Sequence, residues 1–275
     1  MKPFIEKGAL RVRGGAGSEE VVPLVVEEPL EIRINGAPYA VLMRTPGSEV
    51  ELAAGFCMTE GIVDSFAEIA SIGFCPDAEE NSCNVVEVFI KGGTASSEAG
   101  GTLDTRRAME SRSSCGICGA RTLDDIQKKL SPVTGGTVVD AGWLVALQYE
   151  MLGRQELFPL TRGGTHAAAL AKPGGEVIVV REDLGRHNAL DKVIGFAMIN
   201  KIDLENTVAL LSGRISFEMA QKALRAGIPV VAAVSAATAM AVELAERMGC
   251  TLIGRLRDDD MIIYTHPERV RLSEA

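Results

Sequence analysis

The sequence predicts an α/β protein in which a mostly parallel sheet covered by helices follows a smaller, β-rich α+β region. After residue 176, short runs of Val, Ile, Leu and Ala alternate with stretches of helical period, which is typical of βαβ units. Before residue 92, apolar runs are separated by Gly, Pro and Asn, which is typical of strands and turns. Hydrophobic residues make up 47% and charged residues 24% of the 275 residues, so we expect a packed chain rather than a disordered one.

The N-terminal region, residues 1–91, should contain strands, a hairpin and one helix. The Asn35-Gly36 pair lies between two apolar runs and predicts a two-residue hairpin turn. Ser48–Ile62 predicts a helix, with Ser48 as N-cap and Glu51 completing a capping box. The expected strands are Val21–Val26, Leu30–Asn35, Pro38–Arg44 and Asn84–Lys91.

Residues 92–120 are rich in Gly and Ser and have no apolar period, so we expect a mobile segment there. An α/β domain should follow over residues 121–275, with helices that end at the C′ glycines Gly227 and Gly249. Its expected strands are Val177–Val180, Val208–Leu211, Val230–Val234 and Thr251–Gly254, and its expected helices are Asn188–Ile199, Ser216–Ala226 and one ending at Met248.

Charge and composition argue against several classes of function. The chain has 28 Lys and Arg against 37 Asp and Glu, a net charge of −9, which argues against a nucleic-acid-binding protein. No apolar leader is visible, and Gly227 and Pro229 interrupt the longest uncharged stretch, Ala226–Val242, so we expect neither export nor a membrane span. A cytoplasmic location follows, where six cysteines are not expected to form a disulfide framework.

Cys115-Gly-Ile-Cys118 points most directly to chemistry. Two thiols at this spacing can point into one small volume, and the guanidinium of Arg112 or Arg121 would favour the reactive thiolate. One interpretation is therefore a nucleophilic thiol that carries a sulfur atom, with the second cysteine assisting. Two others are half of a structural zinc site and a thioredoxin-like dithiol.

The residues around this pair weigh against some of these interpretations. A zinc site needs about four ligands, and the further candidates Cys75, Cys83 and His166 form no second regular pair. A thioredoxin-like pair would follow an early strand, not a Gly- and Ser-rich stretch in mid-chain. A zinc deaminase requires an upstream His-x-Glu and a proline before its first cysteine, whereas Ser114 precedes Cys115 and all histidines lie downstream. The sulfur-carrying and zinc interpretations both stay open on these grounds.

Basic residues gather where predicted strands end. Ligand sites in parallel sheets lie at the carboxyl ends of strands, and a helix start there offers free N–H groups to an anion. A solvated helix start, capped by Asp183 or Asn188, would explain the same residues without a ligand. The candidates for a phosphate-recognising pocket are Arg186, His187, Lys192, Arg214, Arg255 and Arg257.

Four motifs occur in order along the chain: Arg112–Gly119, Gly163–Ala167, Glu182–Lys192 and the stretch from Ser212 to Thr238. Together they resemble the formate dehydrogenase accessory sulfurtransferases, the FdhD family, over nearly the whole chain. The resemblance implies a cytidine-deaminase-like fold without a catalytic zinc, and a homodimer.

The resemblance also implies a sulfur carrier. A cysteine desulfurase would load a persulfide onto Cys115, and Cys118 would assist its transfer to the molybdenum or tungsten bis(guanine dinucleotide) pterin cofactor of formate dehydrogenase. That cofactor would be bound as a substrate, with no permanent cofactor and no metal site. By the family pattern, the expected cofactor-binding residues are Arg255, Leu256, Arg257, Asp258, Asp259 and Asp260, although the three aspartates depart from that pattern. The ends of the predicted strands add His187, Asn188 and Arg214.

Two alternatives remain for the function. One is a guanine-nucleotide or pterin-binding chaperone without covalent chemistry, and the other is a zinc-stabilised interaction module. In every case Cys57 and Cys250 are expected to be inert core residues, because they lie in apolar segments.

Overall fold

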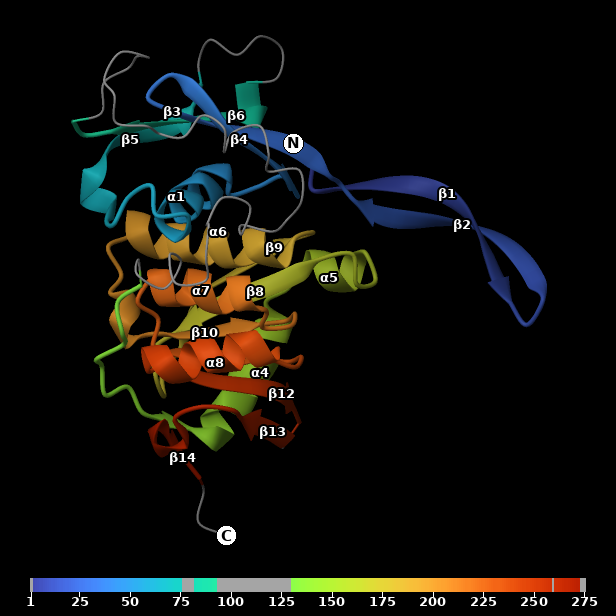
Figure 1. Cartoon of the computed structure of the whole chain (residues 1–275). Coiled ribbons are helices and arrows are strands. Elements are labelled where there is room, and N and C mark those ends of the chain that lie inside the picture. Colours follow the sequence, from blue (N-terminus) through green and yellow to red (C-terminus); the bar gives the residue numbers. More distant parts are fainter. Residues whose placement is uncertain (1, 76–81, 93–129, 259, 273–275) are drawn as a thin grey trace.

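The computed structural model describes residues 2–75, 82–92, 130–258 and 260–272. The fold is α/β, as the sequence predicts. Figure 1 shows an N-terminal sheet, then helix α1 (Glu49–Thr59), then a second sheet with its helices. A hairpin of β1 (Phe4–Arg13) and β2 (Ala16–Val25) projects from the side of this stack.

The N-terminal sheet has four strands in the order β4-β3-β6-β5 and packs one face on α1. Its hairpin is the predicted one: Asn35 and Gly36 have φ of 50° and 84°, and two successive left-handed residues make the two-residue turn that fits twisted strands. The strands are β3 (Glu28–Ile34), β4 (Ala37–Arg44), β5 (Ile69–Phe74) and β6 (Val85–Ile90).

Helix α1 begins differently from the prediction. Ser48 has a φ of 60°, and its side chain accepts no capping hydrogen bond. The Glu51 carboxylate does not return to the helix start but accepts two hydrogen bonds from the guanidinium of Arg181, at 2.6 and 2.8 Å. The predicted capping box is therefore wrong, because a charged partner distant in sequence takes the carboxylate.

The second sheet has six strands in the order β13-β12-β11-β10-β8-β9. Only β10–β11 and β11–β12 pair in parallel, whereas β8–β9, β8–β10 and β12–β13 pair antiparallel. The sheet is mixed, which corrects the expectation of a mostly parallel sheet. The reason is that β8 lies between β9 and β10 and runs opposite to both, since the chain reverses at a tight turn at Gly174 between β8 and β9. The strands are β8 (His166–Ala171), β9 (Val177–Asp183), β10 (Val208–Leu211), β11 (Val230–Ala233), β12 (Thr251–Arg257) and β13 (Asp260–Ile263).

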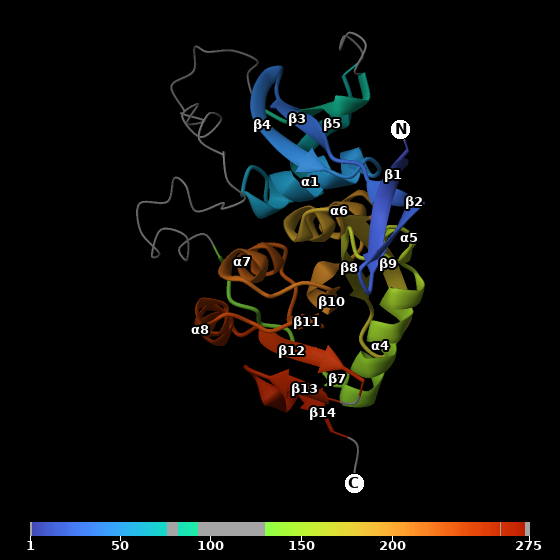
Figure 2. The ribbon, with the colours of Figure 1, turned by 90° about the vertical axis from the view of Figure 1, so that its right-hand side faces the viewer.

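Helices cover both faces of this sheet. On one face lie α6 (Arg186–Ile199), α7 (Phe217–Arg225) and α8 (Ala239–Met248), and on the other lies α4 (Ala141–Gly153) (Figure 2). The predicted apolar face of α6 is confirmed, since Leu190, Val193, Ile194 and Ala197 are fully buried. The remaining elements are α5 (Leu157–Leu160), β7 (Val139–Asp140), β14 (Val270–Arg271) and the short 3-10 turns at Phe66–Glu68, Ser82–Asn84, Leu204–Asn206 and Pro267–Arg269.

The N-terminal region and the second sheet are joined by a close crossing of α1 and α6. A Cβ added to Gly55 would lie 1.9 Å from the carbonyl oxygen of Asp191, and one added to Gly195 would lie 1.8 Å from that of Glu51. One hydrophobic core contains residues of both parts. The predicted boundaries near residues 92 and 120 adjoin or fall in 93–129, outside the described residues, and stay predictions. No helix of the described ranges is both long and apolar enough to cross a bilayer.

Candidate functional site

The carboxyl ends of the central strands meet in one place, here called the carboxyl edge. Because β8 runs antiparallel to its neighbours, its first residue, His166, lies at this edge, opposite Asp183 at the end of β9. The loop after β10 joins it through Ser212, whose hydroxyl accepts the N–H of Ala167 at 2.8 Å. The loop after β11 joins the end of β12 through the N–H of Arg255, which donates to the carbonyl oxygen of Ser235 at 3.0 Å.

Three helices begin at the carboxyl edge without side-chain caps. The N-cap residues of α6, α7 and α8 are Gly185, Ser216 and Thr238, and none accepts a capping hydrogen bond through its side chain. The Ser216 hydroxyl oxygen is buried and has no hydrogen-bond partner among the described residues. The first N–H groups of these helices therefore lack a side-chain cap at the N-cap position, and the dipole at such a helix start favours an anionic ligand.

Four arginines belong to the segments that meet at this edge: Arg186 starts α6, Arg214 follows β10, and Arg255 and Arg257 lie in the last part of β12. Arg214, Arg255 and Arg257 are exposed, and Arg186 is partly buried with an Nε that has no partner among the described residues. None of the four forms an ion pair with a described carboxylate. Arg257 Nε donates to the carbonyl oxygen of Val234 at 3.4 Å. In a chain of net charge −9, guanidinium groups without a described carboxylate partner at one edge indicate a site for phosphate or another anion.

The acidic stretch after β12 is partly turned away from this site. The Asp258 carboxylate accepts a hydrogen bond from the Tyr149 hydroxyl of α4 at 2.8 Å, which holds it beside that helix. Leu256 is fully buried, so only its backbone can face a ligand. Asp260 is exposed, and Asp259 lies outside the described residues.

Two histidines at the edge are held in the neutral form. Burial, and then the positive charges of Arg186 and Lys222, lower the pKa of His187 to about 4. Burial and Arg186 also lower the pKa of His166. The Nε2 atom of His187 lies 2.9 Å from a carboxylate oxygen of Glu218 but makes no hydrogen bond with a described residue. Near neutral pH both rings therefore add polarity to the edge without adding charge.

We predict that His187 makes the protein less stable in acid. Its folded pKa of about 4 lies below the ordinary value of 6.5, so its contribution is complete above pH 6.5. Below that pH the unfolded chain binds the proton first, and the contribution disappears as the pH falls to 4. The free energy of unfolding, measured by urea denaturation at pH 7 and pH 4, should fall by roughly 2–3 kcal/mol more for the wild type than for His187→Gln. Equal losses in the two proteins would contradict this assignment.

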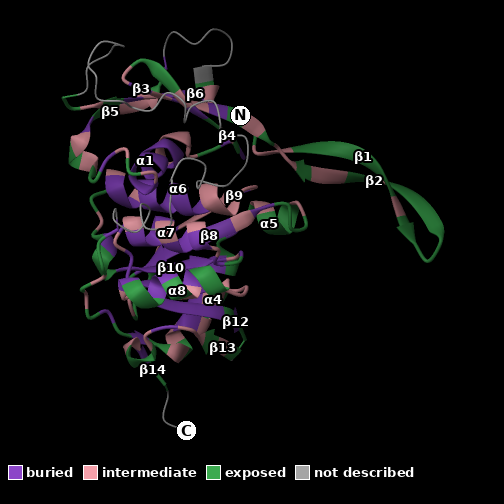
Figure 3. Cartoon of the chain, viewed as in Figure 1, coloured by how far each residue is buried: buried purple, intermediate pink, exposed green. Residues whose placement is uncertain are grey.

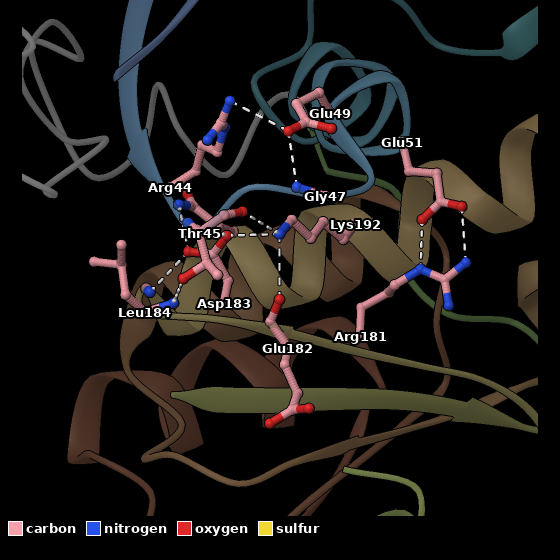
Figure 4. Close-up of polar contacts among 12 residues, drawn as sticks. Arg44, Thr45, Gly47, Glu49, Glu51, Arg181, Glu182, Asp183, Leu184 and Lys192 are labelled. Carbon is pink, nitrogen blue, oxygen red and sulfur yellow. Dashed lines mark hydrogen bonds and ion pairs between the residues drawn. The ribbon is translucent and has the colours of Figure 1, made fainter. Parts of the chain in front are cut away.

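Several motif residues hold the edge together instead of facing it. The Asp183 carboxylate, fully buried, accepts hydrogen bonds from Thr45 N and Asn188 Nδ2 and pairs with Lys192 Nζ at 2.8 Å. Lys192 also donates to the carbonyl oxygens of Thr45 and Glu182 (Figure 4). Lys192 is only 2% exposed, so the structure does not bring it into the anion site as the sequence suggested.

Glu182 and Asn188 have structural partners as well. The Glu182 carboxylate accepts three backbone N–H groups at the start of α5, from Glu156, Leu157 and Phe158, at 2.7–2.8 Å. The amide of Asn188 donates to the carbonyl oxygen of Met43 at 2.8 Å. Asn188 therefore lies beside the site, with its amide nitrogen already engaged, and His187 and Arg214 are the strand-end candidates whose side chains remain available.

The predicted sulfur site, Cys115 and Cys118, lies outside the described residues and stays a prediction. The expectation for two other cysteines is confirmed: burial raises the pKa of Cys57 and of Cys250 to about 12, which makes both thiols unreactive. Of the further zinc candidates, Cys75 is buried and Cys83 is exposed. Within the described ranges, no three His, Cys, Asp or Glu side chains are grouped as metal ligands.

Sequence patterns did not reveal three features of this edge. The uncapped start of α8 and the unpartnered Ser216 hydroxyl depend on backbone geometry that residue types do not reveal. Thr45 was also missed, although its N–H and hydroxyl bind Asp183 and the N–H of Leu184. Thr45 carries no motif of its own, and only the packing of α1 against α6 places it there.

Comparison with known proteins identifies the relatives of this chain. The sequence model of the FdhD/NarQ family matches residues 25–271. A protein of Mycolicibacterium paratuberculosis named Sulfur carrier protein FdhD is 48% identical over 253 residues, which cover 90% of this chain and 91% of that protein. A protein of the same name from Streptomyces avermitilis is 42% identical to this chain, and the match covers 97% of this chain and 95% of that protein.

A solved structure has the same fold. It is the crystal structure of a chain described as a formate dehydrogenase accessory protein from Desulfotalea psychrophila. The TM-score is 0.78 at 22% sequence identity, and the match covers 98% of this chain and 100% of the other. At that identity the likeness shows the fold alone.

Proposed function

Because the chain belongs to the FdhD/NarQ family, we propose that it is a sulfur carrier whose Cys115 takes a persulfide sulfur from a cysteine desulfurase. The acceptor in this proposal is the molybdenum or tungsten bis(guanine dinucleotide) pterin cofactor, before formate dehydrogenase receives it. The observation that carries the proposal is the Cys115-Gly-Ile-Cys118 pair in a chain up to 48% identical to proteins named sulfur carriers. We expect the reaction to take place in the cytoplasm and the active protein to be a homodimer.

In the proposed reaction, the thiols of Cys115 and Cys118 transfer one sulfur atom in two steps. The Cys115 thiolate attacks the outer sulfur of the donor persulfide, so a new S–S bond forms on Cys115 and the desulfurase leaves as a thiolate. In the second step the Cys118 thiolate attacks the inner sulfur on Cys115. This attack forms a Cys115–Cys118 disulfide and expels the outer sulfur as hydrosulfide, which can ligate the metal of the cofactor. A cellular dithiol then reduces the disulfide.

The carboxyl edge supports the cofactor part of the proposal. A guanine dinucleotide carries phosphates, which fit three uncapped helix starts and the guanidinium groups of Arg186, Arg214 and Arg255. The neutral rings of His166 and His187 can donate or accept hydrogen bonds there without repelling the arginines. The exposed carboxylate of Asp260 opposes phosphate binding, so we assign the phosphates to the arginines and helix starts.

Sulfur loading is the direct test. Incubation of the protein with a cysteine desulfurase and cysteine should add sulfur to the intact mass of the wild type, and the adduct should be lost in Cys115→Ala. Cys83→Ala removes an exposed cysteine away from the motif and should load normally. Cys118→Ala should load but fail to release hydrosulfide. No adduct in the wild type, or an adduct that survives in Cys115→Ala, would overturn the proposal.

The alternative function, a cofactor chaperone without covalent chemistry, predicts a different pattern. In that case Cys115→Ala would leave formate dehydrogenase activity in cells intact, whereas Arg214→Ala would remove it. Under the sulfur-carrier proposal both variants lose activity. Arg214→Ala should also weaken GDP binding at least about tenfold by calorimetry, whereas Arg247→Ala, at the opposite end of α8, should not.

A further inference from the structure

Helices α6 and α7 meet through two polar pairs that lie one helical turn apart. At the carboxyl edge, Nε2 of His187 lies 2.9 Å from a carboxylate oxygen of Glu218. Four residues further along each helix, the Lys222 ammonium donates to both carboxylate oxygens of Asp191, at 2.9 and 3.2 Å. Figure 3 shows both helices buried or half-buried along their length, so little water reaches either pair.

The inner pair is complete, whereas the outer pair is not. Lys222 also donates to the Thr59 hydroxyl of α1 at 2.8 Å, so its hydrogen bonds tie three helices together and fix the spacing of α6 and α7. The side chains of His187 and Glu218 are 16% and 14% exposed, and Nε2 makes no hydrogen bond with a described residue. A protonated ring carries N–H on both nitrogens, so it could donate from Nε2 to the carboxylate already facing it.

The surroundings of His187 oppose this protonation in the free protein. Burial lowers its pKa to about 4, and three neighbouring basic groups add to the effect: Arg186, Lys222 and His166. Of the two carboxylates on these helices, Asp191 is neutralised by Lys222, which leaves Glu218 to favour the charged ring. Glu218 alone does not outweigh burial and the basic groups.

An anion at the carboxyl edge would change this balance. A Cβ added to Gly213, in the loop after β10, would lie 3.4 Å from both Cδ of Arg186 and Nδ1 of His166, so the three segments meet closely there. A phosphate that pairs with Arg186 offsets the positive charge adjacent to His187 in the chain. Negative charge within about 4–6 Å favours the charged form of a histidine, so anion binding and protonation should strengthen each other.

We propose that His187 takes up one proton when an anion binds at the carboxyl edge, and that Glu218 is the positioning residue that holds the protonated ring. The proton comes from solvent, the neutral imidazole becomes an imidazolium, and its Nε2–H donates to Glu218. No bond between heavy atoms forms or breaks. This inference rests on the anion site of the proposed function and makes its affinity depend on pH, but it does not depend on sulfur loading.

His166 is a poorer acceptor of this proton, because it faces a hydroxyl group and not a carboxylate. Its Nδ1 lies 3.5 Å from the Ser212 hydroxyl. Burial and Arg186 lower the pKa of His166, and Asp183, which opposes them, is already paired with Lys192. We therefore assign the proton to His187.

Calorimetric titration of the full chain with diguanosine diphosphate, two guanosines joined 5′ to 5′, measures the coupling. Its diphosphate diester keeps a fixed charge in this pH range, unlike a terminal phosphate, which titrates near about pH 6. Binding enthalpies in MES and Bis-Tris at pH 6 should show uptake of about 0.3–0.8 proton per bound ligand, and the dissociation constant should fall at least about twofold from pH 7.5 to pH 5.5. His187→Gln should remove the uptake, and Glu218→Gln should at least halve it.

His266 provides the matched control, since it also lies beside a carboxylate. Its Nδ1 is 3.2 Å from Glu268, and its carbonyl accepts from Thr251, at the opposite end of β12 from Arg255. His266→Gln should leave affinity and proton uptake unchanged. Binding without uptake, uptake that persists in His187→Gln, or uptake unaffected by Glu218→Gln overturns the inference and leaves the anion site standing. Absence of binding at both pH values overturns the inference together with the cofactor-binding part of the proposed function.

NMR follows the ring directly. The chain has three histidines, so ¹³C-histidine labelling gives three ring signals, which His→Gln variants assign. The His187 signal should titrate at a higher pH with diguanosine diphosphate bound than without it, and this difference should shrink in Glu218→Gln. A His187 titration that the ligand does not move, or a change confined to His166, contradicts the assignment.

Discussion

Gly195→Ala should destabilise the protein by more than about 3 kcal/mol or prevent its folding. The added Cβ would lie 1.8 Å from the carbonyl oxygen of Glu51 and 2.8 Å from the backbone nitrogen of Gly55, and these backbone atoms cannot rotate away as a side chain can. To accommodate the methyl group, α1 and α6 must separate and open the core between them. Urea denaturation, or the soluble yield if the variant does not fold, measures the loss.

A matched glycine provides the control. Gly153 is the last residue of α4, and a Cβ added there meets no atom within 4 Å. Gly153→Ala should therefore be neutral or stabilise by up to about 1 kcal/mol, since alanine loses less backbone entropy than glycine in a helix. If Gly195→Ala and Gly153→Ala have the same free energy of unfolding, α1 and α6 do not approach each other as closely as the structure indicates.

Asp183→Asn should cost about 3 kcal/mol, because it leaves the ammonium of Lys192 buried without its carboxylate. The carbonyl oxygens of Thr45 and Glu182 still accept from Lys192, which limits the loss. Adding Lys192→Met to Asp183→Asn removes the buried ammonium that has lost its carboxylate. The double variant should therefore lose less free energy of unfolding than the two single variants lose together. A coupling energy above about 1 kcal/mol from the double-mutant cycle is the expected result.

An exposed pair calibrates this cycle. Glu150 and Arg154 lie one helical turn apart on α4 with side chains 40% and 46% exposed, so Glu150→Gln should cost no more than about 0.5 kcal/mol. Additive losses at Asp183 and Lys192 would contradict a shared buried pair. Because Asp183 also binds Thr45 and the start of α6, its loss should disturb the Arg186 and His187 positions at the carboxyl edge as well.

The sequence was a good guide to elements with a strong local pattern. Asn35-Gly36 specifies its own turn, Val208–Leu211 is a strand as predicted, and Gly227 and Gly249 follow helices with φ of 76° and 72°. Strand β8 had no such pattern: its sequence, His-Ala-Ala-Ala-Leu-Ala, lacks β-branched residues, and pairing with both neighbours forms the strand. Missing β8 made the sheet look mostly parallel.

The site was predicted less completely than the fold. Strand ends correctly located Arg214 and Arg255 at one edge, because that argument needs only the order of strands and helices. It could not tell Lys192, which is buried against Asp183, from Arg186, whose guanidinium reaches the edge, since both follow the same strand. Residue type alone cannot distinguish a charged side chain that binds a ligand from one that a buried carboxylate neutralises, as Asp183 neutralises Lys192.

The shared core of the N-terminal sheet and the second sheet affects how the protein can be dissected. Truncation on either side of residues 93–129 would separate α1 from α6. Each fragment would then expose to solvent the hydrophobic surface that the other part covers in the full chain. Such fragments are expected to aggregate, so their inactivity would report misfolding and say nothing about which half recognises a ligand. Roles in this protein are better assigned by point substitutions at exposed positions such as Arg214 and Arg255.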